Sequence, residues 1–329
     1  MGEKMAEWRY WVIGFVLLSG GLAGSAQAEP VWFSDQPPDA EWAKRAHHAH
    51  GGMIERGRGG VYVKRLWLRA GGEPASAVYT QPADDASFGV FGIDGESLAP
   101  DLFKVASGGG ITFPMPEEGF YNAYFIERSV EDAVLKTSIV KAEVLKHSCG
   151  EGHDPKLTAS RMPPRDRAGV PLEIIRERLP GEDFHTRIRS GDKVGFRVHY
   201  KGSPAAGANV SLTTREGWTK QVVADADGRA VFKLIRDYYP AWNDFDKRHH
   251  EAFLVTAEYR VETPGELNGT PFEKAHYRAT LPGIFYPSEV EYSSYLVGLI
   301  VALIAAALGA GGVFLYRLKH SRAGRERLQ

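Results

Sequence analysis

The sequence contains one cysteine, Cys149, among 329 residues. An intrachain disulfide is therefore excluded, and the fold must be held together by hydrophobic cores. The lone thiol is then buried, paired between molecules or a ligand. An excess of charge is missing as well, since 40 Lys and Arg face 41 Asp and Glu, a net charge of −1. A balanced charge gives no electrostatic footprint for nucleic acid, so we expect no nucleic-acid partner.

Recognisable catalytic motifs are also missing. The sequence has no G-x-S-x-G elbow, H-E-x-x-H helix, phosphate loop or glycine-rich dinucleotide turn. Histidines flank Cys149, but a Cys–His dyad requires a spatial orientation that spacing alone does not establish. We therefore expect that this protein is not an enzyme.

Long apolar runs occur only near the two ends of the chain. The first run, residues 11–18, follows Lys4 and Arg9 and precedes Ala26-Gln27-Ala28. It is too short for a transmembrane helix, which needs about 20 apolar residues. A small-x-small site after such a run is typical of signal peptidase cleavage. We expect residues 1–28 to be a signal peptide, with an uncleaved N-terminal anchor as the alternative.

The second apolar run, residues 295–316, has no charged side chain. About 22 residues at 1.5 Å rise per residue span about 30 Å of hydrocarbon. Basic residues follow it, namely Arg317, Lys319, Arg322, Arg325 and Arg327, against the acidic Glu326. Because positive flanking charge stays on the cytoplasmic side, we predict a transmembrane helix over 294–317 and a basic cytoplasmic tail over 318–329. The bulk of the chain then lies in the periplasm, anchored in the inner (cytoplasmic) membrane by a single pass.

Small residues lie close to one face of this predicted span: Gly298, Ala302, Ala305, Gly309 and Gly312. Small-xxx-small spacing lets a second helix approach closely within lipid. A transmembrane partner is therefore one interpretation, and the other is the ordinary frequency of Ala and Gly in single spans.

The region between the two ends has the pattern of a mainly β protein. Short apolar runs within 59–146 are separated by Gly, Pro, Asp and Ser, which predicts a first β domain there. Residues 29–58 form an irregular, His-containing segment, and 147–170 a polar, Pro-containing linker. Strand patterns resume after the linker, and their spacing predicts an immunoglobulin-like sandwich over 171–285. The expected fold is two extracytoplasmic Ig-like β-sandwich domains and one C-terminal transmembrane helix.

One turn within the second domain is specified by its residues. Asp225-Ala226-Asp227-Gly228-Arg229 separates two apolar runs. Asp-Gly in this setting predicts a β-hairpin, because the turn requires positive φ. A calcium loop is the alternative, but the loop ligands and the distal Glu are missing.

Two segments of this domain carry a family resemblance. Residues 201–212, KGSPAAGANVSL, resemble the G-x-P-x-x-G-A-x-V segment of periplasmic carrier-like β-domains. With residues 224–232, ADADGRAVF, they resemble the NikM-like family, described as the nickel-uptake substrate-specific transmembrane region. The motif match is confined to 201–232, and the shared plan covers 60–317. The resemblance implies binding or delivery of a transition metal, chiefly nickel or cobalt, to an uptake system.

The best metal-ligand candidates lie in the linker, in the segment HSCGEGHDP. The two imidazoles, thiolate and carboxylate belong to His147, Cys149, His153 and Asp154. Imidazole suits nickel, copper and zinc, and a thiolate adds a preference for softer ions. A bound metal would promote deprotonation of the thiol. The alternative is a polar loop that tolerates a thiol.

Two other clusters are weaker candidates. His47, His48 and His50 form a short tract that binds metal only where the chain bends, and the alternative is a solvated segment. A third group contains Asp244, Asp246, His249, His250 and Glu251, next to aromatic residues that indicate an adhesive loop instead. His185, His199 and His276 are isolated, and we expect them to be ordinary surface or core residues.

The preferred interpretation is a membrane-anchored periplasmic metal-handling protein. It would capture a divalent transition metal, with nickel or cobalt favoured and copper or zinc still open, and present it to a membrane permease or another transmembrane subunit. The alternative is a structural or adaptor protein whose β domains bind a protein partner in the envelope without metal. Replacement of His147, Cys149 and His153 distinguishes the two hypotheses, because only the first requires these side chains.

Overall fold

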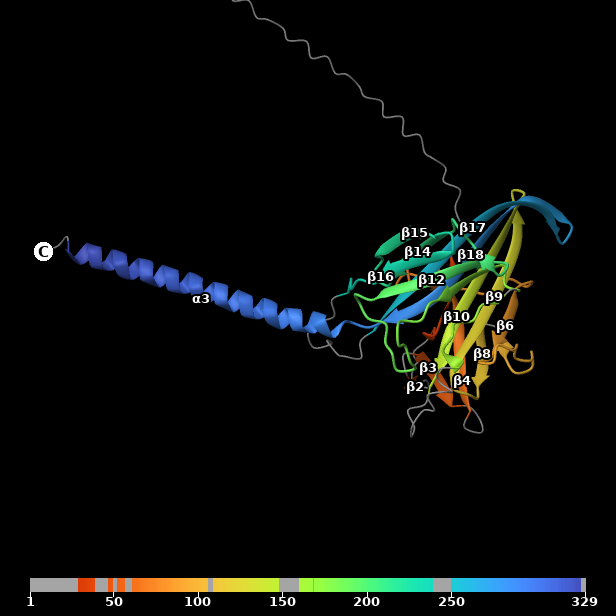
Figure 1. The fold of residues 1–329 in the computed structure, drawn as a ribbon, viewed down its shortest axis with the longest axis horizontal. Helices are drawn as coiled ribbons and strands as arrows, with labels where there is room; N and C mark the ends of the chain where they lie inside the picture. Colours follow the sequence, from red (N-terminus) through yellow and green to blue (C-terminus); the bar gives the residue numbers. More distant parts are fainter. Residues whose placement is uncertain are drawn as a thin grey trace, which may run out of the picture.

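The computed structural model describes residues 29–38, 47–49, 52–56, 61–105, 109–147, 160–167, 169–238 and 250–326. Over these residues the chain is mainly β, arranged in three sheets, and it ends in one long helix, α3 (Glu289–Glu326). Figure 1 shows that α3 extends away from the body formed by the strands. The predicted mainly β fold with a C-terminal apolar helix is confirmed.

The N-terminal sheet has seven strands in the order β2-β3-β4-β8-β7, with β1 and β5 also paired to β4. Its strands are β1 (Val31–Ser34), β2 (His47–Ala49), β3 (Gly52–Arg56), β4 (Tyr62–Ala70), β5 (Val78–Tyr79), β7 (Lys104–Val105) and β8 (Gly110–Met115). All of its pairs are antiparallel.

The central sheet has seven strands in the order β15-β14-β17-β18-β10-β9-β6. Its strands are β6 (Ser87–Phe91), β9 (Gly119–Glu131), β10 (Val134–Lys146), β14 (Asn209–Thr214), β15 (Thr219–Val223), β17 (Glu251–Leu267) and β18 (Thr270–Phe285). β10 and β18 pair in parallel, from Val134 opposite Lys274 to Val140 opposite Thr280. This parallel pair joins strands from the two sides of the predicted linker in one hydrogen-bonded sheet.

The C-terminal sheet has four strands, in the order β11-β12-β13, with β16 also paired to β12. Its strands are β11 (Leu172–Arg176), β12 (Lys193–Tyr200), β13 (Ser203–Pro204) and β16 (Arg229–Lys233). All of its pairs are antiparallel as well.

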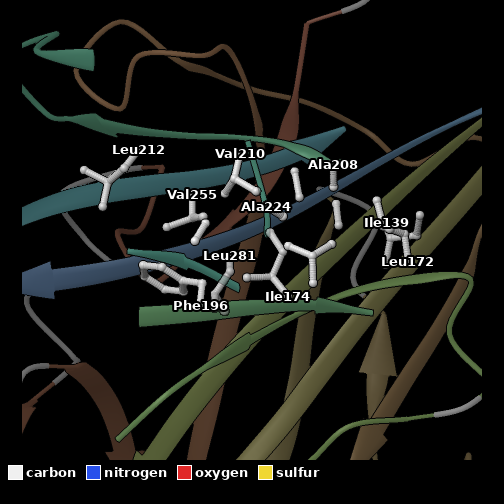
Figure 2. Close-up of a cluster of buried hydrophobic side chains, with 14 of the residues drawn as sticks. Ile139, Leu172, Ile174, Phe196, Ala208, Val210, Leu212, Ala224, Val255 and Leu281 are labelled. Atoms are coloured by element: carbon white, nitrogen blue, oxygen red, sulfur yellow. The ribbon is translucent and has the colours of Figure 1, made fainter. Parts of the chain in front are cut away.

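The central sheet is covered on both faces. Successive side chains of a strand point to opposite faces, and neighbours in the central strands accordingly belong to two different cores. Ile139 and Val255 pack into the core shared with the C-terminal sheet, whereas Val140 and Leu254 pack into the core shared with the N-terminal sheet. Figure 2 shows the first core, where Ile174 and Phe196 lie near Val255 and Leu281. Each fully buried side chain of this size contributes about 1.5–3 kcal/mol.

The two predicted domains therefore share a sheet, although each region contributes most of one core. The Ig-like character of 171–285 and the boundaries at 59–146 and 147–170 stay predictions. The predicted signal peptide, residues 1–28, lies outside the described residues.

The Asp225–Gly228 segment forms the predicted turn, closed also by the Asp225 amide on the Arg229 carbonyl at 3.0 Å, but its flanking strands do not continue as a paired hairpin. The Gly228 amide donates to the Asp225 carbonyl at 3.0 Å, and Gly228 has a φ of +71°. The strands on either side pair in different sheets, β15 with β14 and β16 with β12. The turn thus carries the chain from the central sheet to the C-terminal sheet. The Asp-Gly signal specifies that the chain reverses direction here, but not which strands β15 and β16 pair with.

The described part of the predicted linker is tied to the body at several points. Arg161 donates to the Glu118 carbonyl at 2.7 Å, and Arg165 donates to the Asp94 carbonyl at 3.0 Å. Arg178, just after β11, donates to the Met162 carbonyl at 2.7 Å. Residues 160–167 therefore act as a strap between turns of the first region and the C-terminal sheet.

The helix α3 contains a segment, Leu296–His320, that is long and apolar enough to cross a membrane. The side chains of this segment are exposed and not buried within the protein. The predicted span 294–317 lies within α3. Apolar side chains with no protein cover fit a lipid environment. The orientation of the span and the identity of the membrane stay predictions.

Candidate functional site

The candidate site is a pair of histidines from distant parts of the chain. His147 follows the last residue of β10, and His185 lies in the β11–β12 loop. Their Nε2 atoms are 2.9 Å apart, and their ring centroids are separated by 4.4 Å at an interplanar angle of 84°. His147 is 5% exposed, whereas His185 lies on the surface. The pair therefore combines a fixed, buried imidazole with an accessible one.

Aromatic packing fixes the buried histidine. The Phe184 ring lies 5.7 Å from the ring of His147, and Phe184 is itself 4% exposed. Phe120, on β9, packs edge-on against Phe184 with centroids 6.3 Å apart. The Phe184 side chain anchors the loop in the body, and His185, as the next residue, is held opposite His147.

A tight turn positions His185. The Asp183 carboxylate accepts hydrogen bonds from the His185 amide at 2.9 Å and from the Thr186 hydroxyl at 2.7 Å. The Thr186 hydroxyl bond, followed by the His185 amide, holds the pKa of Asp183 below its usual value. An ionised Asp183 thus keeps the turn closed at neutral pH.

Charged side chains support the start of this loop. Arg176 donates two hydrogen bonds to Glu182, at 2.6 and 3.0 Å, and Arg178 donates to Glu143 on β10 at 2.5 Å. Burial alone would raise the pKa of Glu143, but the guanidinium groups of Arg178 and Arg176 outweigh it and lower the pKa to about 2. These ion pairs connect the β11–β12 loop to the same face of β10 that ends at His147.

A second buried ion pair lies further along that face. Lys141 contacts Glu173 at 2.6 Å, and Tyr124 donates to the same carboxylate oxygen at 2.5 Å. Burial, and next the charge of Glu173, raise the pKa of Tyr124 well above its usual value. Lys141 also donates to the Ile174 carbonyl at 3.1 Å. The cluster of Lys141, Glu173 and Tyr124 therefore joins the central sheet to the C-terminal sheet. Because its charged groups already bond to one another and to the backbone, we do not regard it as a ligand site.

The geometry of the histidine pair fits two ligands of one ion. Imidazole nitrogens about 2.0–2.1 Å from a tetrahedral ion lie about 3.3 Å from each other. The two Nε2 atoms are at 2.9 Å, the distance of a hydrogen bond between the two imidazole rings. A separation larger by a few tenths of an ångström would match the spacing of two ligands on one ion.

The other predicted ligands are only partly placed. Cys149, His153, Asp154 and His50 lie outside the described residues, and within the described part no group of three metal-ligating side chains occurs. His47 and His48 belong to β2, where His47 pairs with Ile54 and His48 with Met53. Only the backbone of these two residues is described.

The remaining histidine candidates have other contacts. His250 packs on Tyr286 at 5.5 Å, and Asp244, Asp246 and His249 lie outside the described residues. The buried Glu251 pairs with Arg215 at 3.3 Å.

The two isolated histidines outside the site each face a carboxylate. His199 lies 3.2 Å from Asp166, and His276 lies 3.5 Å from Glu258. The contact with His276, followed by that with Arg278, lowers the pKa of Glu258 to about 2.

His185 is the site residue that the sequence pattern did not indicate. It lies 38 residues from His147, and neither its spacing nor its neighbours distinguish it from other surface histidines. Only the packing of the β11–β12 loop on β10 brings the two rings together.

The site also lies close to the beginning of α3. β10 and β18 run parallel, so their carboxyl ends leave the central sheet on the same side. The loop that carries His185 continues to Ile188, whose carbonyl accepts the Tyr286 amide at 2.9 Å. Tyr286 directly follows β18, and α3 begins three residues later, at Glu289.

Comparison with known proteins gives no match. No protein-family model matches the chain, and no curated protein matches it significantly. The resemblance of residues 201–232 to the NikM-like family therefore stays a prediction.

Proposed function

We propose that this protein is a membrane-anchored, extracytoplasmic metal-handling subunit that binds a divalent transition metal through His147 and His185. The observation that supports this function best is the 2.9 Å separation of the two Nε2 atoms. Cys149, His153 and Asp154 follow His147 within seven residues and supply further ligands. Nickel or cobalt is the favoured cargo because the family resemblance implies them, whereas imidazole ligands suit nickel, copper and zinc alike.

The position of the site favours delivery to a membrane partner. Residues 289–295 of α3 precede the apolar segment, and at 1.5 Å per residue they form a stalk of about 10 Å. A site beside the base of this stalk is within reach of the outer mouth of a neighbouring permease. The protein would hold the ion there for a transmembrane subunit of an uptake system.

Calorimetry on the full chain in detergent micelles tests the proposal. Ni²⁺, Co²⁺, Cu²⁺ and Zn²⁺ are titrated into the wild type, into His147→Ala and His185→Ala, and into the variant lacking His147, Cys149 and His153. We expect one-to-one binding in the wild type, a loss of at least tenfold in affinity in each single variant, and no binding in the triple variant.

A matched control uses a histidine outside the site. His199→Ala removes an imidazole that lies near Asp166 and not in the candidate site, so its metal affinity should equal that of the wild type. Absence of binding for all four ions in the wild type would contradict metal handling. The adaptor hypothesis, in which the β regions bind a protein partner without metal, would then be preferred.

A further inference from the structure

The β11–β12 loop connects the histidine pair to the base of α3. Three residues after His185, the loop runs beside the segment that follows β18. The Tyr286 amide donates to the Ile188 carbonyl at 2.9 Å, and the Ser190 amide donates to the Tyr286 carbonyl at 2.8 Å. This two-bond ladder joins the loop to the chain just before the helix.

Side chains reinforce the same junction. The Ser288 amide donates to the Ser190 hydroxyl at 2.9 Å, and Ser288 is the last residue before α3. The Arg187 guanidinium lies 4.8 Å from the centre of the Tyr286 ring, within range of a cation–π contact. Ser190 is buried, so its hydroxyl holds Ser288 in a protected environment.

The loop is stiff on both sides of the junction. Asp183 closes the turn before His185, as described above. Within the junction, the Arg189 amide donates to the Asp192 carboxylate at 2.7 Å, and after it the Gly191 amide donates to the Leu234 carbonyl at 2.8 Å. These bonds brace the loop on both sides of the ladder, so we expect a displacement of His185 to be passed along the backbone to Ile188 and Ser190.

The two histidines differ in their freedom to move. His147 is buried at the end of a central strand, whereas His185 lies on the surface of the loop. The adjustment of a few tenths of an ångström that an ion requires would therefore come from His185, whose position is tied to the loop by Phe184 and Asp183. The same unit carries Ile188 and Ser190, which hold the base of α3.

We infer that metal binding at the His147–His185 pair is coupled to the base of α3 through the β11–β12 loop. This inference depends on the metal site proposed above and adds how its loading reaches the membrane helix. Binding moves the His185 ring a few tenths of an ångström away from His147 and shifts the Ile188–Ser190 ladder, which changes the packing of Tyr286 and Ser288. The loaded and empty states then present α3 differently to a membrane partner.

Hydrogen exchange on the full chain in micelles, with and without Ni²⁺, tests this coupling. We expect Ni²⁺ to change the exchange rates of the Tyr286 and Ser288 amides and of the first turn of α3 by at least threefold. His185→Ala should abolish both the binding of Ni²⁺ and this change. Ser190→Ala should bind Ni²⁺ within twofold of the wild type by calorimetry but lose the change at Ser288.

Two further variants complete the design. Arg187→Gln removes the exposed cation–π contact without emptying a buried position, and it should reduce the change at Tyr286 even if Ser190→Ala folds poorly. Ser97→Ala, at an exposed position where the hydroxyl donates to the Leu98 carbonyl, should behave as the wild type. Ni²⁺ binding with unchanged exchange over 286–292 overturns the coupling and leaves the metal site standing. Failure of Ni²⁺ to bind at all overturns both.

Discussion

The Nζ atom of Lys141 lies 2.6 Å from Oε1 of Glu173, and the two side chains are only 3% and 2% exposed. This ion pair joins the central sheet to β11 inside the protein. Removing one member of a buried pair leaves an uncompensated charge and costs about 3–5 kcal/mol, whereas apolar replacement of both is often neutral.

Lys141→Met and Glu173→Gln should therefore each lower the free energy of unfolding by about 3–5 kcal/mol, measured by urea titration of tryptophan fluorescence in micelles. The double variant Lys141→Met/Glu173→Leu should be more stable than either single variant. Lys136, paired with Glu131 on the surface, provides the control, and Lys136→Met should cost less than about 1 kcal/mol. Equal losses at the two lysines would contradict a special role for the buried pair.

Glu143 makes stability depend on pH in the acid range. Its pKa is lowered to about 2 in the folded protein, because Arg178 and Arg176 outweigh the effect of burial. The stabilisation is fully present above the unfolded pKa of about 4.5 and is lost as pH falls towards 2. Glu143→Gln should therefore reduce stability at pH 7 and flatten the pH dependence between about 4.5 and 2.

Urea midpoints at several pH values between 7 and 2.5 measure this effect. Glu96→Gln, in an exposed turn, is the matched control and should retain the pH profile of the wild type. A Glu143→Gln profile parallel to that of the wild type would show that other carboxylates govern acid unfolding.

Gly228 should not tolerate a side chain. Its φ is +71°, and an added Cβ would lie 2.5 Å from the Val198 carbonyl oxygen. Gly181 has nearly the same φ, +70°, but nothing lies within 4 Å of its Cβ position. Gly181→Ala should therefore cost only the backbone strain of about 1–2 kcal/mol, and Gly228→Ala clearly more. Thermal unfolding of the two variants side by side separates steric overlap from backbone strain.

The β9–β10 turn should become more stable with glycine. Asp132 and Ala133 have φ values of +52° and +57°, and alanine is unfavourable in this region. Ala133→Gly removes about 1–2 kcal/mol of strain but adds freedom to the unfolded chain, so a net gain of about 0.5–1 kcal/mol is expected.

The control for this substitution is Ala99→Gly, at an exposed position without positive φ, which should not gain stability in the same urea titration. A loss of stability in Ala133→Gly would mean that the turn relaxes in solution to a different geometry.

Local signals in the sequence were sufficient for the elements but not for their assembly. Alternating apolar residues and Gly-rich breaks correctly indicated a mainly β chain and an apolar C-terminal helix. The turn at Asn268-Gly269, with φ values of +50° and +82°, was also readable, because Asn-Gly strongly favours a two-residue hairpin turn. The Asn-Gly pair thus specifies the tip of the β17–β18 hairpin, where Leu267 pairs with Thr270.

Long-range pairing left no such signal. Nothing near Val134 indicates that it pairs with Lys274, because the alternation of half-buried and buried residues over 134–139 is typical of a strand but does not select its partner. The same limit applies to the candidate site. His147 was identified from its neighbours in the chain, whereas its observed partner, His185, depends on how a loop packs against a strand.

The parallel pairing of β10 with β18 also sets the order of events during biosynthesis. β18 is the last strand before α3, so a nascent chain presents β9 and β10 long before the partner of β10 has been made. Until residues 270–285 emerge, the edge of β10 that pairs with β18 has no partner strand, and Ile139 lacks the β18 side chains of its core. Unpaired strand edges are where folding intermediates aggregate. We therefore expect the nascent protein to be prone to aggregation until β18 emerges, and a chain truncated before β18 to be degraded instead of forming a smaller folded domain.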